Sequence, residues 1–230
     1  MGYKHIFFDL DRTLWDFESN SYETLLELCS GYKLNNKGIA DYDEFINNYK
    51  FHNEELWNLY RINKISQQDL RRERFQRALA DFGIDNYILA KNIGEDYIKF
   101  CPRKNKLFPY VFEVLDYLKD RYTLHIITNG FEKTQHIKLE NANLAIYFKH
   151  VITSENLGFK KPNPSIFSYA LDLAAAKKEE SIYIGDNLVV DILGCQNFGI
   201  DGIYFNPDKK EHNENVAFEI SSLREIMEIL

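Results

Sequence analysis

The feature that most constrains this chain is a short apolar run that ends in two aspartates near the amino terminus. Residues 6–8 are apolar, Asp9 follows them directly, and Asp11 comes two positions later. An apolar run of this length suits a buried parallel strand, and open α/β sheets bind ligands at the carboxyl ends of such strands. Because side chains alternate along a strand, Asp9 and Asp11 would point to the same side if the chain stays extended through Leu10.

Two carboxylates this close repel each other. Such a pair usually either binds a cation or separates its pKa values for acid and base work. A plainer alternative is a strand followed by an Asp-rich turn, with Thr13 as a helix cap. This segment alone leaves both interpretations open.

Length and composition are compatible with a folded protein of one large or two small domains. The 230 residues are 45% hydrophobic and 15% aromatic, which is enough for a full core. The net charge of −7 argues against binding to nucleic acid or to anionic membranes, which both need a basic surface. No apolar run approaches the roughly 18 residues of a membrane span. We therefore expect a cytoplasmic protein without a membrane or nucleic-acid partner, either a monomer or a dimer.

Residues 16–101 contain no convincing strand and are expected to form several amphipathic helices. Asn20 or Ser21 can cap the first of them. Ser66 with Asp69 resembles a capping box that opens a later helix. This part of the chain is therefore predicted to be an all-helical insert.

The remainder of the chain alternates between short apolar runs and helical patterns. Strands are expected at 122–128, 150–153, 181–185, 202–205 and 216–220, and helices from Pro109 and at 132–141, 164–174 and 188–198. Repeated β-α units predict a parallel sheet with helices on both faces. The fold class is thus α/β, with a Rossmann-like core of residues 1–15 and 102–230 that is interrupted by an all-helical cap of residues 16–101.

Polar residues stand at the ends of two further expected strands. Thr128, Asn129 and Gly130 supply a hydroxyl, an amide and a flexible backbone position that could cradle an oxyanion. Asn-Gly is also the commonest hairpin signal, although a helical pattern follows it here. Asp186 and Asp191 follow another strand, and such oxygen ligands suit Mg²⁺. The alternative is a helix with one of these acids as its cap and the other in its early turns.

Lys160 and Lys161 stand directly before Pro162, at the expected entrance to a helix. A lysine locked by a following proline is well placed to neutralise a phosphate. Two lysines in a loop are more often solvated surface, and only one of them needs to be functional.

Taken together, the motifs resemble the haloacid dehalogenase-like superfamily of aspartyl phosphohydrolases. The resemblance rests on Asp9-Leu-Asp11-Arg-Thr13, Thr128, Lys161 and Gly185-Asp186…Asp191, which occur in the family order, and on a helical insert that resembles the C1 cap of subfamily I. The stretches 11–17, 127–135 and 154–162 are similar to YjjG-type 5′-nucleotidases, which hydrolyse pyrimidine nucleoside monophosphates, including non-standard ones.

The resemblance implies an Mg²⁺-dependent phosphomonoester hydrolase of small-molecule substrates that works through an aspartyl-phosphate. It assigns Asp9 as nucleophile and Asp11 as acid and base; Asp9, the backbone carbonyl of Asp11, Asp186 and Asp191 as metal ligands; Thr128, Asn129, Gly130 and Lys161 as phosphate-binding; and Thr13 as a support that orients Asp11. The family pattern of lysine before proline favours Lys161 over Lys160. The cap is expected to close over the site and select the leaving group.

Several alternatives share this fold. Phosphoglycolate or a sugar phosphate could be the substrate, because cap residues choose it. A 2-haloacid dehalogenase uses the first aspartate but neither the second nor Mg²⁺, so Asp11 argues against it. A non-catalytic, phosphate-binding regulator on the same scaffold is a further alternative, because function resides in sites and not in folds.

Overall fold

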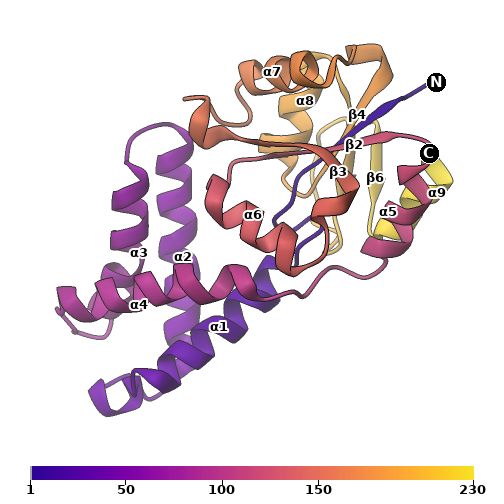
Figure 1. Cartoon of the computed structure of the whole chain (residues 1–230). Helices are drawn as coiled ribbons and strands as arrows, with labels where there is room; N and C mark the ends of the chain where they lie inside the picture. Colours follow the sequence, from indigo (N-terminus) through magenta and orange to yellow (C-terminus); the bar gives the residue numbers. More distant parts are fainter. Residues whose placement is uncertain (1) are drawn as a thin grey trace. The chain divides into compact units, whose positions relative to one another are not determined.

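The computed structural model describes residues 2–230, which divide into two compact units (Figure 1). The core unit combines Met1–Phe17 with Asn105–Leu230, and the helical unit is Glu18–Lys104. Among the described residues, no helix is both long enough and apolar enough to span a membrane.

The core unit is built on one parallel sheet. Its strands are β1 (His5–Phe8), β2 (Thr123–Thr128), β3 (Phe148–Thr153), β4 (Ser181–Gly185), β5 (Asp201–Phe205) and β6 (Phe218–Ile220). They lie in the order β3-β2-β1-β4-β5-β6, and every neighbouring pair is parallel. The predicted α/β class is therefore confirmed, and β1 is a central strand although both strands that pair with it, β2 and β4, follow it by more than 100 residues.

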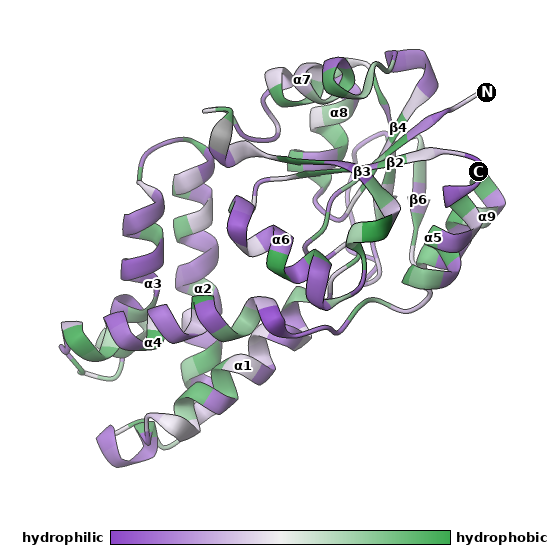
Figure 2. Cartoon of the chain, in the orientation of Figure 1, coloured by the Kyte–Doolittle hydropathy of each residue, from purple (hydrophilic) through white to green (hydrophobic). Residues whose placement is uncertain are grey.

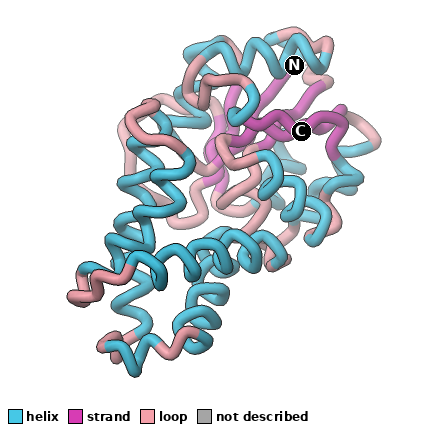
Figure 3. Tube along the Cα trace, turned by 60° about the vertical axis from the view of Figure 1, so that its left-hand side comes forward, coloured by secondary structure: helices cyan, strands magenta, loops and turns pink. Residues whose placement is uncertain are grey.

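Helices cover both faces of this sheet, as Figures 1 and 3 show. They are α5 (Val111–Lys119), α6 (Glu132–Asn141), α7 (Pro164–Ala174), α8 (Gly194–Phe198) and α9 (Ile226–Ile229). On one face, Ile166 and Phe167 of α7 pack with Phe7, Ile127 and Ile152 of the strands in a fully buried cluster. Burial on both faces explains why β1, β2 and β4 are mostly apolar in sequence.

The helical unit contains α1 (Phe17–Gly31), α2 (Tyr42–Arg61), α3 (Gln67–Ala80) and α4 (Tyr87–Phe100). Much of α2 and α3 is hydrophilic in Figure 2, and each buries only a stripe of residues. The predicted capping box of Ser66 and Asp69 is present at the start of α3. The predicted cap of α1 was wrong, because α1 begins at Phe17. Asn20 and Ser21 are instead buried within it.

Two further expectations need correction. The segment expected as one helix over 188–198 begins as a π-helix, Leu188–Leu193, and continues as α8. The last strand is shorter than the expected 216–220. Short 3₁₀ turns at Leu34–Lys37, Cys101–Arg103, Ala145–Tyr147, Ser154–Asn156, Lys178–Glu180 and Leu223–Glu225 complete the chain.

Strand register decides which residues meet at the sheet edge. Phe8, the last residue of β1, pairs with Ile126 on β2 and with Ile184 on β4. Parallel strands end at the same edge, so the polar residues that follow these three strands gather there.

Candidate active site

Asp9 and Lys161 form a buried ion pair at the carboxyl end of β1. Lys161 Nζ donates to Asp9 Oδ1 at 2.6 Å and lies 2.7 Å from Asp191 Oδ1. Only 2% of the Lys161 side chain is exposed, although its sequence position is a loop. Desolvating a lysine is costly unless carboxylates compensate, and here two of them do. Lys161 therefore belongs to the site, whereas Lys160 forms none of these ion pairs.

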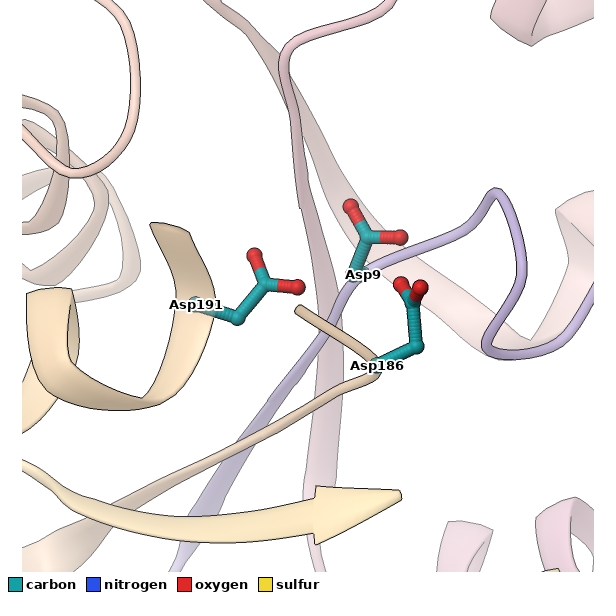
Figure 4. Close-up of side chains that lie close together, drawn as sticks. All are labelled: Asp9, Asp186 and Asp191. Atoms are coloured by element: carbon teal, nitrogen blue, oxygen red, sulfur yellow. The ribbon is translucent and has the colours of Figure 1, made fainter. Parts of the chain in front are cut away.

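Three carboxylates converge beside this lysine. One oxygen from each of Asp9, Asp186 and Asp191 lies within 4.8 Å of the others, and Figure 4 shows their side chains directed toward one another. They come from three different places: the end of β1, the loop after β4 and the π-helix. An all-oxygen donor set of this charge fits a hard divalent cation such as Mg²⁺.

The electrostatics of the cluster support the same interpretation. Burial, reinforced by the charge of Asp191, outweighs Lys161 and raises the pKa of Asp9 to about 7. Burial and the charges of Asp191 and Asp9 raise the pKa of Asp186 well above its usual value. Burial alone would lower the pKa of Lys161, but Asp191 and Asp9 reverse this and raise it. One lysine does not balance two buried acids and a third that is half-buried, so a bound cation would stabilise their ionised forms.

Gly185 allows Asp191 to reach the cluster. A Cβ atom at Gly185 would lie 2.6 Å from Asp191 Oδ2, so a larger residue would displace this carboxylate. The backbone N–H of Asn187 donates to Asp191 Oδ2 at 3.0 Å and fixes its orientation. The wider turn of the π-helix contains Asp191, and π-helical turns are frequent at functional sites. This local geometry departs from the regular helix that the apolar periodicity predicted.

The loop after β2 lies beside the same cluster. Thr128 Oγ1 accepts from Gly130 N at 3.0 Å, which shapes the turn. Both ends of the Asn129 side-chain amide bind the backbone of Lys161: Nδ2 donates to its carbonyl at 3.0 Å, and Oδ1 accepts from its N–H at 2.8 Å. Asn129 thus ties the lysine loop to the end of β2. The expected hairpin alternative is excluded because α6 begins at Glu132.

Asp11 lies apart from the three-carboxylate cluster. The strand ends at Phe8, and the chain turns through Arg12, whose φ of 67° is left-handed. Gln135 Nε2 donates to Asp11 Oδ2 at 2.8 Å, and Lys138 Nζ donates to Asp11 Oδ1. Asp9 and Asp11 therefore have different partners. The carboxylate of Asp9 binds Lys161, whereas that of Asp11 binds two side chains of α6.

Thr13 is fully buried, and its hydroxyl donates to Asp186 Oδ1 at 3.4 Å. The sequence suggested that Thr13 orients Asp11. The bond that the structure gives its hydroxyl is to Asp186, so Thr13 connects the turn after β1 to the loop after β4.

Sequence reasoning missed three polar residues of this site. Tyr183 accepts from Lys161 Nζ at 2.7 Å and donates to the carbonyl of Ile127 at 3.0 Å, within the sheet core. Gln135 and Lys138 are buried on the face of α6 that binds Asp11. Their helical spacing of three was a usable signal, because it places a glutamine and a lysine on one face of a helix that follows a polar strand end.

Comparison with known proteins agrees with this architecture. The family model described as haloacid dehalogenase-like hydrolase matches residues 6–205. The pyrimidine 5′-nucleotidase PynA of Streptococcus pneumoniae is 32% identical, with 100% of this chain and 96% of PynA covered. The pyrimidine 5′-nucleotidase YjjG of Escherichia coli is 29% identical, with 100% and 99% covered.

A solved structure shows the same fold throughout. The crystal structure of the HAD-hydrolase YfnB from Bacillus subtilis, bound to magnesium, superposes with a TM-score of 0.89 at 28% identity. The match covers 100% of this chain and 99% of YfnB. Since the family model covers most of the chain and the relatives match over its whole length, this protein belongs to the haloacid dehalogenase-like hydrolase family.

Proposed function

We propose that the protein is a phosphomonoester hydrolase that depends on Mg²⁺ and works through an aspartyl-phosphate intermediate. The observation that carries this proposal is the Asp9 carboxylate, which lies at the end of a central strand against Lys161 and the two other cluster acids. A nucleophilic carboxylate needs nearby positive charge to meet an anionic phosphate, and this site supplies one lysine and a set of metal ligands.

In the first step, an oxygen of Asp9 attacks phosphorus, and the bond from phosphorus to the ester oxygen breaks. Asp11 gives its proton to the departing oxygen, which leaves as an alcohol. In the second step, Asp11 accepts a proton from water as that water attacks phosphorus, and the bond from phosphorus to the Asp9 oxygen breaks. Inorganic phosphate leaves, and both aspartates return to their initial states. The separate surroundings of Asp9 and Asp11 support this division of roles.

Asp9, Asp186 and Asp191 would hold Mg²⁺, with the backbone carbonyl of Asp11 as the expected further ligand. When bound, the ion offsets negative charge on the phosphoryl group and on the cluster acids. Lys161 would also contact the phosphoryl oxygens, and the hydroxyl of Thr128 with the amides that follow it would bind the remaining oxygens. Asn129 would act mainly through the lysine loop, whose backbone it holds.

For the substrate, we propose a pyrimidine nucleoside 5′-monophosphate. The support comes from PynA and YjjG, two relatives named as pyrimidine 5′-nucleotidases that align along the whole chain. We also propose that the helical unit acts as a cap that selects the leaving group. The YfnB structure, whose study describes interdomain movement, supports a mobile cap of this kind.

The chemistry is tested with p-nitrophenyl phosphate and Mg²⁺. We expect Asp9→Asn to lower kcat by about 10⁴-fold or more, because the amide cannot form the phosphoryl intermediate. The matched control is Asp172→Asn, at an exposed position of α7, which should retain full activity. Equal background rates for the wild type and Asp9→Asn would favour the non-catalytic, phosphate-binding alternative.

The substrate is tested by comparing kcat/KM for uridine and thymidine monophosphates with that for phosphoglycolate and sugar phosphates. The nucleotide proposal expects the pyrimidine nucleotides to rank first. If a sugar phosphate or phosphoglycolate ranks above them, the phosphatase mechanism stands and the nucleotide assignment fails. The dehalogenase alternative is tested by measuring halide release from 2-chloropropionate. We expect none, because a dehalogenase needs neither Asp11 nor a cluster of metal-binding carboxylates.

A further inference from the structure

The carboxylate of Asp11 is held by two donors from α6. Gln135 Nε2 binds one carboxylate oxygen at 2.8 Å, and Lys138 Nζ binds the other. The donors belong to residues three positions apart, so one face of one helix presents both. A carboxylate with each oxygen bound by a different donor is restricted in rotation as well as in position.

Lys138 is poorly explained as a residue that only stabilises the fold. Only 5% of its side chain is exposed, and Asp11 is the only carboxylate in residues 2–230 that pairs with it. Its ammonium group also lies 4.2 Å from the centre of the Trp15 ring and 5.7 Å from that of Phe17. An apolar residue in such an aromatic environment generally stabilises a protein as well as a buried ion pair does. We therefore expect that the role of Lys138 is to orient the Asp11 carboxylate that it binds.

The loop after β2 lies against the side-chain amide of Gln135. A Cβ atom at Gly130 would lie 1.5 Å from Gln135 Nε2, so the absence of a side chain at Gly130 makes room for the amide group. The side chain of Gln135 is 1% exposed. The Thr-Asn-Gly loop and Asp11 are thus connected through one buried amide, although they are separated by more than 100 residues in sequence.

We propose that Lys138 and Gln135 are positioning residues that hold the Asp11 carboxylate where it exchanges a proton with the leaving group. This inference rests on the proposed phosphatase function. It also predicts that the effect depends on the substrate, because proton donation by Asp11 matters only when the leaving group is poor. An alkoxide from a nucleotide or another alkyl phosphate must be protonated as it departs, whereas p-nitrophenolate is stable without a proton.

The test compares two substrates in Lys138→Met. For thymidine monophosphate, or for whichever alkyl phosphate the wild type hydrolyses best, we expect kcat/KM, which reports the first step and not the later attack of water, to fall by about 100-fold. For p-nitrophenyl phosphate the loss should stay below about 10-fold, because Asp11 contributes little to that first step. Gln135→Leu should show the same substrate dependence with a smaller loss. Lys133→Met, at an exposed position of the same helix, is the matched control and should leave both rates unchanged.

A double mutant separates positioning from general damage to the site. In an Asp11→Asn background, adding Lys138→Met should lower kcat/KM for the alkyl phosphate by less than about 3-fold, because the lysine then has no carboxylate to position. Thermal melting of each variant verifies that it is folded.

Two results would overturn the inference: equal losses on both substrates in Lys138→Met, or a full 100-fold additional loss in the Asp11→Asn background. A wild-type protein that hydrolyses neither substrate would instead overturn the proposed phosphatase function, so the two failures are distinguishable.

Discussion

The two ends of the central sheet bury titratable side chains in opposite ways. At the carboxyl end, Asp9, Asp191 and Lys161 form buried ion pairs at 2.6 and 2.7 Å. Toward the amino end, His125 is fully buried between two other histidines, and no carboxylate contacts it among the described residues. The carboxyl end of the sheet therefore buries ion-paired side chains, whereas the amino end buries a neutral imidazole ring.

The histidine stack runs across three adjacent strands. The ring of His125 on β2 lies 5.5 Å from that of His5 on β1 and 5.3 Å from that of His150 on β3, measured between centroids. Burial, together with the charges that His5 and His150 would carry, lowers the pKa of His125 to about 3. The imidazole is thus neutral in the folded protein at pH 7. Burial shifts both groups toward their neutral forms, and a compensating opposite charge lies beside Asp9 but not beside His125.

The largest expected effect comes from removing the ammonium group of Lys161 at the carboxyl end of the sheet. Lys161→Met leaves Asp9 and Asp191 buried without their partner, so we expect the free energy of unfolding at pH 7 to fall by about 3 kcal/mol or more. Phosphatase activity should fall by about 10³-fold, since the same ammonium would contact the phosphoryl group. Urea denaturation and kcat measurements check the two effects.

Lys160→Met is the matched control for that experiment. Its side chain is partly exposed and forms no ion pair with the cluster, so it should change stability by about 0.5 kcal/mol or less. Similar losses in both variants would contradict the distinction that the structure draws between the two lysines.

Next in size is the effect of Mg²⁺ on stability. Burial, together with the charges of the neighbouring aspartates, raises the pKa values of Asp9 and Asp186, so a divalent cation that favours the ionised carboxylates should stabilise the fold. At a magnesium concentration about 100 times its Kd, the gain is about 2.7 kcal/mol, which corresponds to a rise in Tm of about 5 to 10 °C for a chain of this size. Chelation with EDTA should reverse the rise.

Asp186→Asn sharpens this measurement. It removes one charge from the cluster, so its metal-free Tm should equal or exceed that of the wild type, while its response to Mg²⁺ should largely disappear. A wild-type Tm that does not respond to Mg²⁺ would contradict the proposed metal site.

The smallest expected effect concerns His125, toward the amino end of the sheet. The pKa of His125 is about 3 in the folded state and 6.5 as its ordinary value, so the unfolded chain binds a proton between these values and the folded protein does not. Stability contributed by the neutral ring is therefore complete above pH 6.5 and is lost as the pH falls toward 3. Between pH 7 and pH 5 this loss amounts to about 1 kcal/mol after allowance for solvent screening.

His125→Phe keeps the stacked ring and removes the titration, so its free energy of unfolding should fall less between pH 7 and pH 5 by that amount. His136→Phe, at an exposed position of α6, should retain the wild-type pH dependence. If His125→Phe and the wild type have parallel profiles, then the buried histidine does not control stability in this range.

Much of the fold could be predicted from local patterns. The run before Asp9 and the apolar segments that became β2 and β4 were recognisable because strands buried on both faces are continuously apolar. The capping box at Ser66 was recognisable because both of its partners lie within one helical turn. The start of α1 could not be recognised in this way. Ser21 is a residue type that often caps helices, but here its hydroxyl lies 2.8 Å from that of Tyr97 on another helix. A tertiary contact outweighed the local preference there.

In the candidate site, too, some features could be predicted from local sequence patterns and others could not. The sequence by itself determined the fold class and the strand ends that carry polar groups, since apolar periodicity and strand termini are local properties. Only the tertiary structure decided that Thr13 contacts Asp186 and that Asp11 is held by α6, and only it brought Lys161, which the family resemblance favoured over Lys160, against Asp9. These pairs join segments separated by more than 100 residues, and strand register and helix packing set their distances, which no local pattern encodes.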